Sequence, residues 1–228
     1  MTYVFDPAPQ ASLAIKDSDQ RFPIRRVFCV GRNYGDHARE MGHDPDREPP
    51  FFFTKPADAV FDMPEKLPYP PGTSNLHHEI ELVVLVGKGG VNIDKAVASD
   101  HIFGYAVGLD MTRRDLQAAA KKLGRPWDWG KAFDFSAPCG PVHLVSETGI
   151  INTGSVWLSV NGQKRQTGDI ADLIWSVDEV ISIISHSMEL AAGDVIMTGT
   201  PAGVGPVVSN DKITAGIDRL GQIETILS

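Results

Sequence analysis

The residues with the clearest chemical potential are two glutamates and an aspartate in the middle of the chain. Glu79 and Glu81 are two residues apart, and an apolar, β-branched run covers residues 80–86. On a strand, this spacing places both side chains on one face. Like charges that close repel each other unless something neutralises them, and oxygen ligands are what Mg²⁺, Mn²⁺ and Ca²⁺ prefer. Asp110 ends a second apolar run and is the natural third ligand of such a cation.

Two alternatives remain open when this segment is considered alone. A Glu-x-Glu pair is also common on the solvated edge of a sheet, where no cation is needed. His77 and His78 precede the pair, and histidine is a frequent metal ligand. Because adjacent residues on a strand face opposite ways, only His77 shares the face of Glu79. We expect both histidines to pack around the site or support it rather than to bind a metal.

A histidine and a glutamate three residues apart could carry proton transfer. His37 and Glu40 lie in a stretch with helical character, 36–41, where an i,i+3 pair meets on one face. A carboxylate orients an imidazole and raises its pKa, which suits a histidine that must take a proton from water. A surface pair on a solvated helix would have the same spacing. The polar, proline-containing residues 42–50 follow, and we expect this stretch to act as a mobile lid over substrate.

Short strands with a few helices must position these groups. Runs of apolar and β-branched residues predict strands at 26–30, 51–56, 80–86, 102–109, 140–144, 155–160, 195–197 and 222–227. Helices are predicted at 36–41, 94–99, 113–123 and 177–187, whereas 64–74 and 198–205 are rich in Gly and Pro and predict loops. Asn161-Gly162 indicates a hairpin turn, and the chain is expected to return to strands after Trp127. Strands do not alternate regularly with long helices, so the sequence predicts a β-dominated α+β fold with rolled or barrel-like sheets.

Length and composition indicate one globular domain and exclude some partners. The chain has 228 residues, of which 42% are hydrophobic and 22% charged, which suits one sizeable core. A formal net charge of −8 argues against a nucleic-acid or anionic-membrane partner. Cys29 and Cys139 form no CxxC motif, which favours reduced, buried thiols. No signal-peptide pattern or membrane-spanning apolar stretch occurs, so we expect a soluble, cytoplasmic protein.

Four short motifs occur in a fixed order along the chain. They are GRNY at 31–34, HHEIE at 77–81, GLDMTRRD at 108–115 and TGTP at 198–201. In this order, and separated by apolar strands, they resemble the fumarylacetoacetate hydrolase family from about Val27 to Leu227. Within the family, the short single-domain form is most similar to fumarylpyruvate hydrolases and acylpyruvases. The resemblance implies a mixed β-sandwich roll, usually assembled as a homodimer, with residues 1–22 as an arm or first strand and 23–228 as a single catalytic domain.

The resemblance also implies roles for the acidic residues and for the His–Glu pair. Glu79, Glu81 and Asp110 match the family's metal ligands, for which Mg²⁺ or Mn²⁺ is the expected ion and Ca²⁺ an alternative. His37 and Glu40 match a dyad that activates water. This strengthens the catalytic interpretation of a pair that would otherwise be taken for a surface contact.

Four further residues are candidates for binding the substrate. Lys131 matches a family lysine that binds a substrate oxygen near the metal, although a surface lysine with a snorkelling side chain would look the same in sequence. Arg32 offers a bidentate fork for a carboxylate. Thr200 offers a hydroxyl beside loop N–H groups that could form an anion-binding nest. Gln117 is the third candidate for binding a carboxylate or carbonyl group of the substrate. Arg113 and Asp115 could frame the same pocket or form a structural ion pair.

We therefore expect a Mg²⁺- or Mn²⁺-dependent hydrolase that cleaves a carbon–carbon bond in a 2,4-dioxo acid. Its expected reaction is fumarylpyruvate to fumarate and pyruvate, as in the degradation of aromatic compounds through gentisate. The alternatives are an acylpyruvase, an oxaloacetate decarboxylase or an enol–keto isomerase of the same family. A non-catalytic protein that binds a metal or a small acid is the remaining alternative. The expected partner is a small dicarboxylic or acylpyruvate substrate.

Overall fold

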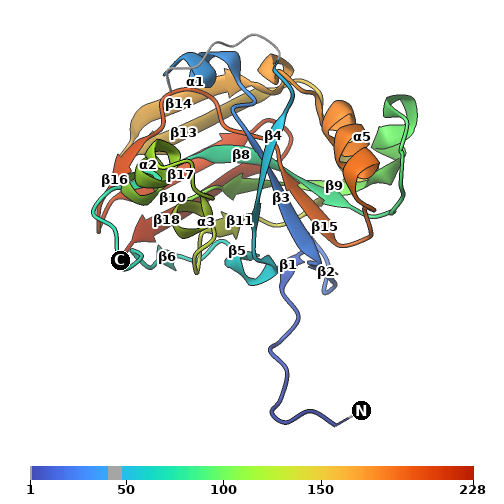
Figure 1. The fold of residues 1–228 in the computed structure, drawn as a ribbon, viewed down its shortest axis with the longest axis horizontal. Coiled ribbons are helices and arrows are strands. Elements are labelled where there is room, and N and C mark those ends of the chain that lie inside the picture. Colours follow the sequence, from blue (N-terminus) through green and yellow to red (C-terminus); the bar gives the residue numbers. More distant parts are fainter. Residues whose placement is uncertain (1, 41–47) are drawn as a thin grey trace.

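The computed structural model describes residues 2–40 and 48–228. Within them the chain forms a curled, β-dominated body with short helices around its rim (Figure 1). Residues 2–11 have no regular structure, and those before Gln10 extend away from this body. Among the described helices, none combines the length and apolar character needed to span a membrane.

A large mixed sheet forms the centre of the molecule. Its strands are β3 (Arg26–Gly31), β4 (Phe51–Lys55), β5 (Val60–Asp62), β8 (Ile80–Val86), β9 (Ile102–Leu109), β11 (Ala137–Cys139), β12 (His143–Leu144) and β15 (Asp194–Met197). They run in the order β4-β3-β15-β8-β9-β11-β5, and β12 pairs with β9. The pairs β3/β15 and β5/β11 are parallel, and the other pairs are antiparallel.

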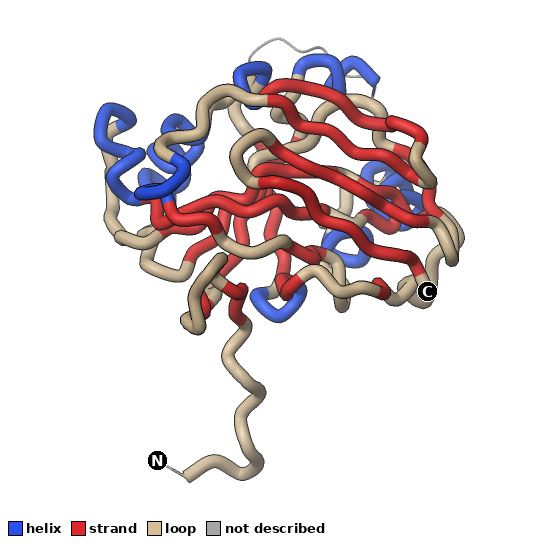
Figure 2. The backbone as a smooth tube through the Cα atoms, turned by 180° about the vertical axis from the view of Figure 1, so that it is seen from behind, coloured by secondary structure: helices blue, strands red, loops and turns tan. Residues whose placement is uncertain are grey.

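A second sheet packs against the first, as the view from behind shows (Figure 2). It contains β6 (Lys66–Leu67), β13 (Ser155–Val160), β14 (Gln163–Asp169), β17 (Lys212–Ile217) and β18 (Gly221–Leu227) in the order β14-β13-β17-β18-β6. Two small sheets complete the body. They are the hairpin of β1 (Ser12–Ala14) and β2 (Arg21–Pro23), and the set of β7 (Leu76–His78), β10 (Thr112–Arg113) and β16 (Gly205–Val207).

The helices are short and lie at the ends and edges of the sheets (Figure 1). The α-helices are α1 (Gly35–Glu40), α2 (Arg114–Lys122), α3 (Asp128–Lys131), α4 (Val145–Thr148) and α5 (Val177–Ser187). The 3-10 helices are η1 (Ala57–Ala59), η2 (Lys95–His101) and η3 (Ile170–Asp172). Helix α5 begins with a capping box between Ser176 and Glu179, which satisfies orphan N–H groups of its first turn.

Strand β8 separates two hydrophobic cores. Its seven residues are all buried, and alternate side chains point to opposite faces. Leu82 and Val84 belong to the core between the two large sheets, whereas Val83 and Leu85 belong to a second core on the other face. Burial of each such side chain contributes roughly 1.5–3 kcal/mol, so both faces fix the register of this strand. Glu81 lies on the same face as Val83, at the end of the second core.

The predicted β-dominated α+β fold is confirmed, and the helices expected at 113–123 and 177–187 form as α2 and α5. The hairpin at Asn161-Gly162 also forms, and both residues have the positive φ values, 51° and 74°, that a tight turn requires. The two cysteines are free and buried, as expected. The stretch expected as a short helix at 94–99 forms the 3-10 helix η2.

Several sequence predictions were wrong, including the strand at 140–144, of which only residues 143–144 form a strand, and three others have a clear physical reason. The chain forms helix α3 after Trp127 instead of returning directly to strands, because a single helical turn is too short to give a periodic signal. Strand β6 lies inside the predicted loop 64–74, where parallel pairing with β18 at the sheet edge decides its conformation. Strand β17 was not predicted because Gly216 interrupts its pattern. A Cβ atom at Gly216 would lie 2.8 Å from the Trp157 ring, so close packing requires glycine there.

The N-terminal segment packs on the second core before the chain enters the main sheet. Leu13 and Phe22, from β1 and β2, are buried in that core. Strand β2 continues across the expected boundary between residues 22 and 23. We keep the division into an arm, 1–22, and one catalytic domain, 23–228, as a proposal.

Asn33 connects the segments that carry the candidate substrate-binding residues, and its removal is expected to destabilise the fold. Its fully buried amide donates to the carbonyls of Trp175 and Thr198, at 2.9 and 2.8 Å, and accepts from Trp175 N at 2.8 Å. Asn33→Ala leaves these buried groups unsatisfied and should lower the free energy of unfolding by about 2–4 kcal/mol, measured by urea denaturation. Asn152→Ala, at an exposed position, is the control, and equal stabilities of the two variants would contradict the prediction.

Candidate active site

Strand pairing brings the three acidic residues together. Ile80 of β8 pairs with Leu109 of β9, so Glu79 and Asp110 lie opposite each other, and Asp110 N donates to Glu79 O at 2.8 Å. One oxygen from each of Glu79, Glu81 and Asp110 lies within 4.8 Å of the others. The side chains are buried, with relative exposures of 4%, 3% and 0%. A solvated sheet edge therefore does not describe them.

Strand periodicity predicted that the two glutamates lie together, but it explains their proximity only in part. Glu79 is not inside a strand, because it lies between β7 and β8, where the chain passes from a small sheet into the main sheet. Its position is held by the backbone contact with Asp110 as well as by the spacing to Glu81. Sequence spacing alone could not predict this change of sheet.

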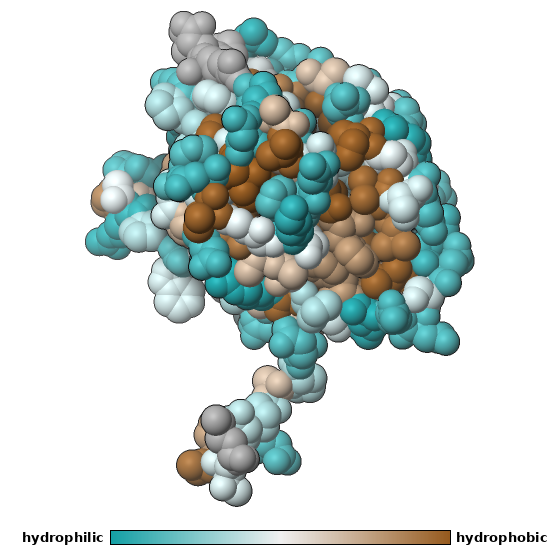
Figure 3. Space-filling model, turned by 90° about the vertical axis from the view of Figure 1, so that its right-hand side faces the viewer, coloured by the Kyte–Doolittle hydropathy of each residue, from teal (hydrophilic) through white to brown (hydrophobic). Residues whose placement is uncertain are grey.

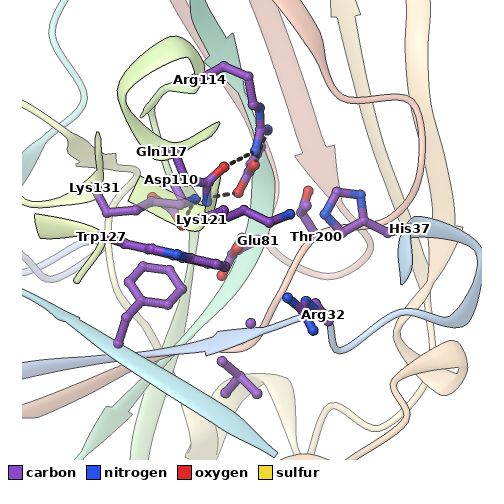
Figure 4. A pocket seen from close by; sticks show the side chains of 14 residues that line it. Arg32, His37, Glu81, Asp110, Arg114, Gln117, Lys121, Trp127, Lys131 and Thr200 are labelled. Carbon is purple, nitrogen blue, oxygen red and sulfur yellow. Dashed lines mark hydrogen bonds and ion pairs between the residues drawn. The ribbon is translucent and has the colours of Figure 1, made fainter. Parts of the chain in front are cut away.

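Among the described residues, three cations compensate the buried carboxylates, and Figure 4 shows two of them, Lys131 and Arg114. Lys131 Nζ lies 2.7 Å from Glu79 Oε2 and 2.6 Å from Asp110 Oδ2, and Arg114 pairs with Glu79. Lys55 Nζ lies 2.9 Å from Asp110 Oδ1. Burial alone would raise the pKa of Glu79, but Lys131 and Arg114 outweigh burial and hold this pKa well below its usual value. Burial would lower the pKa of Lys131, but Asp110 and Glu79 outweigh it and raise this pKa.

Glu81 has a different environment from the other two carboxylates. Its Oε2 accepts a hydrogen bond from Gly199 N at 2.8 Å. Burial raises the pKa of Glu81, and the negative charges of Asp110 and Glu79 raise it further. Gly199 has a φ of +102°, and a Cβ atom there would lie 2.8 Å from Cβ of Asn33. Glycine is therefore required for the loop to present this N–H to the carboxylate.

The donor set fits a hard divalent cation. It consists of carboxylate oxygens only, which suits Mg²⁺ or Mn²⁺ with other oxygen ligands completing the coordination. Asp110 Oδ1 is buried, and its contact among the described residues is the ion pair with Lys55 Nζ at 2.9 Å, which leaves a second lone pair on this oxygen. This oxygen therefore retains the capacity to bind a cation. Glu79, Glu81 and Asp110 are the residues that could hold it.

His37 and Glu40 meet on helix α1, as their spacing predicts. His37 Nδ1 lies 3.5 Å from Glu40 Oε2, an ion-pair contact without hydrogen-bond geometry, and Glu40 accepts from Gly203 N at 3.0 Å. His37 is buried and lines the same cleft as the acidic residues, whereas Glu40 is exposed. Burial lowers the pKa of His37, although Glu79 and Glu40 act in the opposite direction. The neutral imidazole, which can accept a proton, is therefore favoured.

The remaining predicted site residues also line this cleft (Figure 4). Lys131 is buried, so a snorkelling surface lysine does not describe it. Gln117 Oε1 accepts from Arg114 at 2.6 Å, and Thr200 Oγ1 accepts from Gln166 Nε2 at 2.7 Å. Arg32 follows β3 with a φ of 60°, a left-handed conformation that is uncommon outside glycine and is often found at functional sites.

The two histidines before Glu79 support the surroundings of the site. His77 Nε2 contacts Asn75 Oδ1 at 3.0 Å, and its Nδ1 accepts from Arg114 Nε at 3.3 Å. Burial and then Arg114 lower the pKa of His77 to about 4, so it is neutral at pH 7. His78 Nδ1 lies 2.9 Å from Gln166 Oε1. Neither ring belongs to the group of side chains that could hold a metal among the described residues.

Sequence reasoning missed several polar residues of this site. They are Lys55, Arg114, Lys121 and Gln166. Arg113 was considered in place of Arg114, but it stacks on the Phe133 ring at 4.3 Å and does not pair with Asp115. Asp115 instead accepts from Thr73 Oγ1 at 2.6 Å. The helical spacing 114, 117 and 121 was the available signal, because it places these three side chains on one face.

The predicted lid, 42–50, lies mostly outside the described residues, which end at 40 and resume at 48. The loop N–H groups expected to form an anion nest near Thr200 have partners within the protein. Gly199 donates to Glu81 and Gly203 donates to Glu40. They therefore position two of the protein's own carboxylates.

Comparisons with known proteins show which family the chain belongs to. The family model for the fumarylacetoacetate (FAA) hydrolase C-terminal domain matches residues 26–227. The chain belongs to the fumarylacetoacetate hydrolase family. It is 52% identical to fumarylpyruvate hydrolase from Pseudomonas aeruginosa, whose structure contains Mn²⁺ and pyruvate. The TM-score is 0.97, and the match covers 99% of both chains.

Curated members of this family have two different activities. The chain is 44% identical over 193 residues to the mitochondrial oxaloacetate tautomerase FAHD1 of Bos taurus, covering 85% of this chain and 87% of the relative. It is 42% identical over 185 residues to fumarylpyruvate hydrolase of a Ralstonia species, covering 80% of this chain and 96% of the relative. Family membership therefore leaves both a hydrolase and a tautomerase to be considered.

Binding of a divalent cation is expected to release protons through Glu81. Its pKa is raised, so a fraction of the metal-free protein carries a proton there that a cation must displace. Mn²⁺ affinity should therefore fall as the pH is lowered, because protons then compete with the cation for the Glu81 carboxylate. Isothermal titration calorimetry in buffers of different ionisation enthalpy measures the released protons. Glu147→Gln, at an exposed site, should behave like wild type, and Mn²⁺ binding without proton release would contradict the prediction.

Proposed function

We propose that this protein is a Mg²⁺- or Mn²⁺-dependent fumarylpyruvate hydrolase that produces fumarate and pyruvate. The observation that carries the proposal is a cleft lined by a buried carboxylate triad, a buried lysine and His37, with Glu40 beside His37. A relative that matches 99% of the chain binds Mn²⁺ and pyruvate, which supports the assignment. A protein that only binds a metal or an acid would not need the dyad.

The side chains of the cleft can be given roles in this reaction. A divalent cation held by Glu79, Glu81 and Asp110 supplies Lewis-acid stabilisation of negative charge on the pyruvyl end of the substrate. Glu40 contacts Nδ1 of His37, which leaves Nε2 free to take a proton from water. Lys131 Nζ lies between Glu79 and Asp110, where it can stabilise an oxyanion.

The bond changes follow from these roles. The water oxygen forms a bond to the carbonyl carbon of the fumaryl group, and its proton passes to His37. The carbon–carbon bond between this carbonyl and the methylene group then breaks. The electron pair stays with the pyruvyl fragment, and the proton held by His37 passes to the former methylene carbon to give pyruvate and restore the neutral imidazole. Fumarate leaves with the new carboxylate oxygen.

A tautomerase is the second candidate, because a relative at 44% identity is an oxaloacetate tautomerase. Assays of fumarylpyruvate, acetylpyruvate and oxaloacetate in parallel, with Mn²⁺ and then with EDTA, separate the possibilities. We expect the largest kcat/KM for fumarylpyruvate and loss of activity with EDTA. Faster reaction of acetylpyruvate would indicate an acylpyruvase, and enol–keto exchange or decarboxylation of oxaloacetate alone would reject the hydrolase.

We also propose that the protein acts in the cytoplasm, in aromatic catabolism, as a homodimer. Hydrophobic residues gather on the side of the molecule that carries α5 (Figure 3). Val97 of η2 and Met188 after α5 are exposed hydrophobic residues. An exposed apolar area of this kind is typical of a protein interface. A mass in light scattering near that of one chain, 24.7 kDa, would contradict the dimer.

Loss of His37 is expected to impair turnover without impairing metal binding. His37→Ala removes the base but none of the three carboxylates, so kcat should fall on the order of 10²–10⁴-fold while Mn²⁺ affinity stays unchanged. Calorimetry and steady-state kinetics measure the two effects. His186→Ala, in an exposed position on α5, is the control, and a wild-type kcat for His37→Ala would rule out the proposed base.

The pH dependence of the reaction should report the same dyad. Because burial lowers the pKa of His37 below its usual 6.5, the acidic limb of kcat/KM should lie below that value. The charge of Glu40 favours the protonated imidazole, so Glu40→Gln should move this limb to still lower pH. A limb that moves upward in Glu40→Gln would contradict the assigned partner.

A further inference from the structure

Two cations of the cleft differ from the others in having no anionic partner among residues 2–40 and 48–228. Lys131 and Arg114 pair with the acidic triad, whereas Arg32 and Lys121 form neither an ion pair nor a side-chain hydrogen bond with these residues. Lys121 Nζ lies 5.9 Å from the centre of the Trp127 ring. In Figure 4 it extends across the cleft toward Thr200, with Arg32 nearby.

The positive charges of the cleft outnumber its carboxylates. Arg32, Arg114, Lys121 and Lys131 line it together with three acidic side chains, before any metal cation is added. Burial lowers the pKa of Lys121, and the charges of Arg32 and Arg114 lower it further. Cations that close repel each other unless an anion binds between them. The cleft is therefore suited to a substrate with more than one negative charge.

Helix α2 sets the distance between the two ends of the cleft. Arg114, Gln117 and Lys121 lie at positions i, i+3 and i+7, so they share one face of the helix. Arg114 contacts the acidic triad, and Lys121 lies two turns further along, roughly 10 Å away for a rise of 1.5 Å per residue. The two carboxyl carbons of extended fumarylpyruvate are about 7 Å apart, from C–C bonds of about 1.5 Å. Because arginine and lysine side chains are long and flexible, they can reach a substrate that is shorter than the distance between their positions on the helix.

The wall between these ends is aromatic. Phe53 and Trp127 both line the cleft, and their ring centres are 5.7 Å apart. Such a surface suits a planar, conjugated carbon segment better than a polar one. The order along the cleft is therefore a metal-binding end, an apolar wall and an unpaired cationic end.

We propose that Lys121, together with Arg32, binds the second carboxylate of a dicarboxylic 2,4-dioxo acid and thereby selects the fumaryl group over shorter, uncharged acyl groups. This inference rests on the proposed hydrolase function, because it assigns the distal end of the same substrate. Acetylpyruvate has no second carboxylate, and the two carboxylates of oxaloacetate are too close together to reach both ends of the cleft. Lys121 is a specificity-determining residue in this assignment.

The test compares Lys121→Met, Lys121→Arg and Lys122→Met in the metal-loaded protein. Lys122 follows Lys121 on the same helix and is exposed, so its variant is a matched control. Loss of one charge-assisted contact in Lys121→Met should lower the ratio of kcat/KM for fumarylpyruvate to that for acetylpyruvate by on the order of tenfold or more. Lys121→Arg, which keeps the charge, should restore most of this ratio, and Lys122→Met should leave it unchanged. Thermal unfolding of each variant verifies that it is folded.

A binding measurement makes the test independent of turnover. Fumarate has two carboxylates, whereas crotonate has the same carbon skeleton with only one carboxylate. Calorimetry with Mn²⁺ present should show that Lys121→Met weakens fumarate binding at least tenfold more than crotonate binding. If wild type does not cleave fumarylpyruvate, the proposed function fails, and this measurement alone decides the subsite. An unchanged substrate ratio in an active Lys121→Met variant, or equal effects on both acids, would overturn the inference.

Discussion

Burial of three carboxylates at the ends of β8 and β9 is the constraint on which the site depends. Removing an ionised carboxylate from water costs several kcal/mol, and three such groups side by side add mutual repulsion. Lys131, Arg114 and Lys55 offset this cost in the metal-free structure. They come from α3, α2 and β4, so three separate elements must be in place before the acidic residues can be buried.

The two faces of the main sheet explain why the cluster lies where it does. Even-numbered residues of β8 fill the core between the large sheets, and odd-numbered residues fill the second core. The two glutamates continue the odd-numbered face of β8 beyond its last apolar side chain, and Asp110 lies opposite Glu79 at the end of β9. One face is thus apolar over most of its length and polar at one end. The same curled sheet supplies a stable core and a water-excluding wall for charged groups, which interact more strongly there than in solvent.

Buried amides hold the surrounding loops in a fixed arrangement. Asn33 joins the GRNY turn to Thr198 and Trp175, and Gln166 joins His78 to Thr200. Gly199, positioned between these contacts, donates its N–H to Glu81. Each of these groups satisfies backbone or side-chain atoms that would otherwise be buried without partners. The loops that carry Arg32 and Thr200 are therefore held in place by buried hydrogen bonds.

The sequence by itself predicted the type of fold, the Glu79–Glu81 pair and the pairing of His37 with Glu40, because these depend on local periodicity and short spacing. Asp110 was added as the end of a second apolar run and through the family resemblance. It did not determine the change of sheet at Glu79 or the approach of Lys55, which is 55 residues before Asp110 in the chain and meets it only when β4 and β9 belong to one curled sheet. Arg114 and Lys121 were missed for a related reason. A helical face is readable from spacing, but which face meets the cleft depends on how α2 packs. Tertiary structure alone decided which charges are paired and which remain available to a substrate.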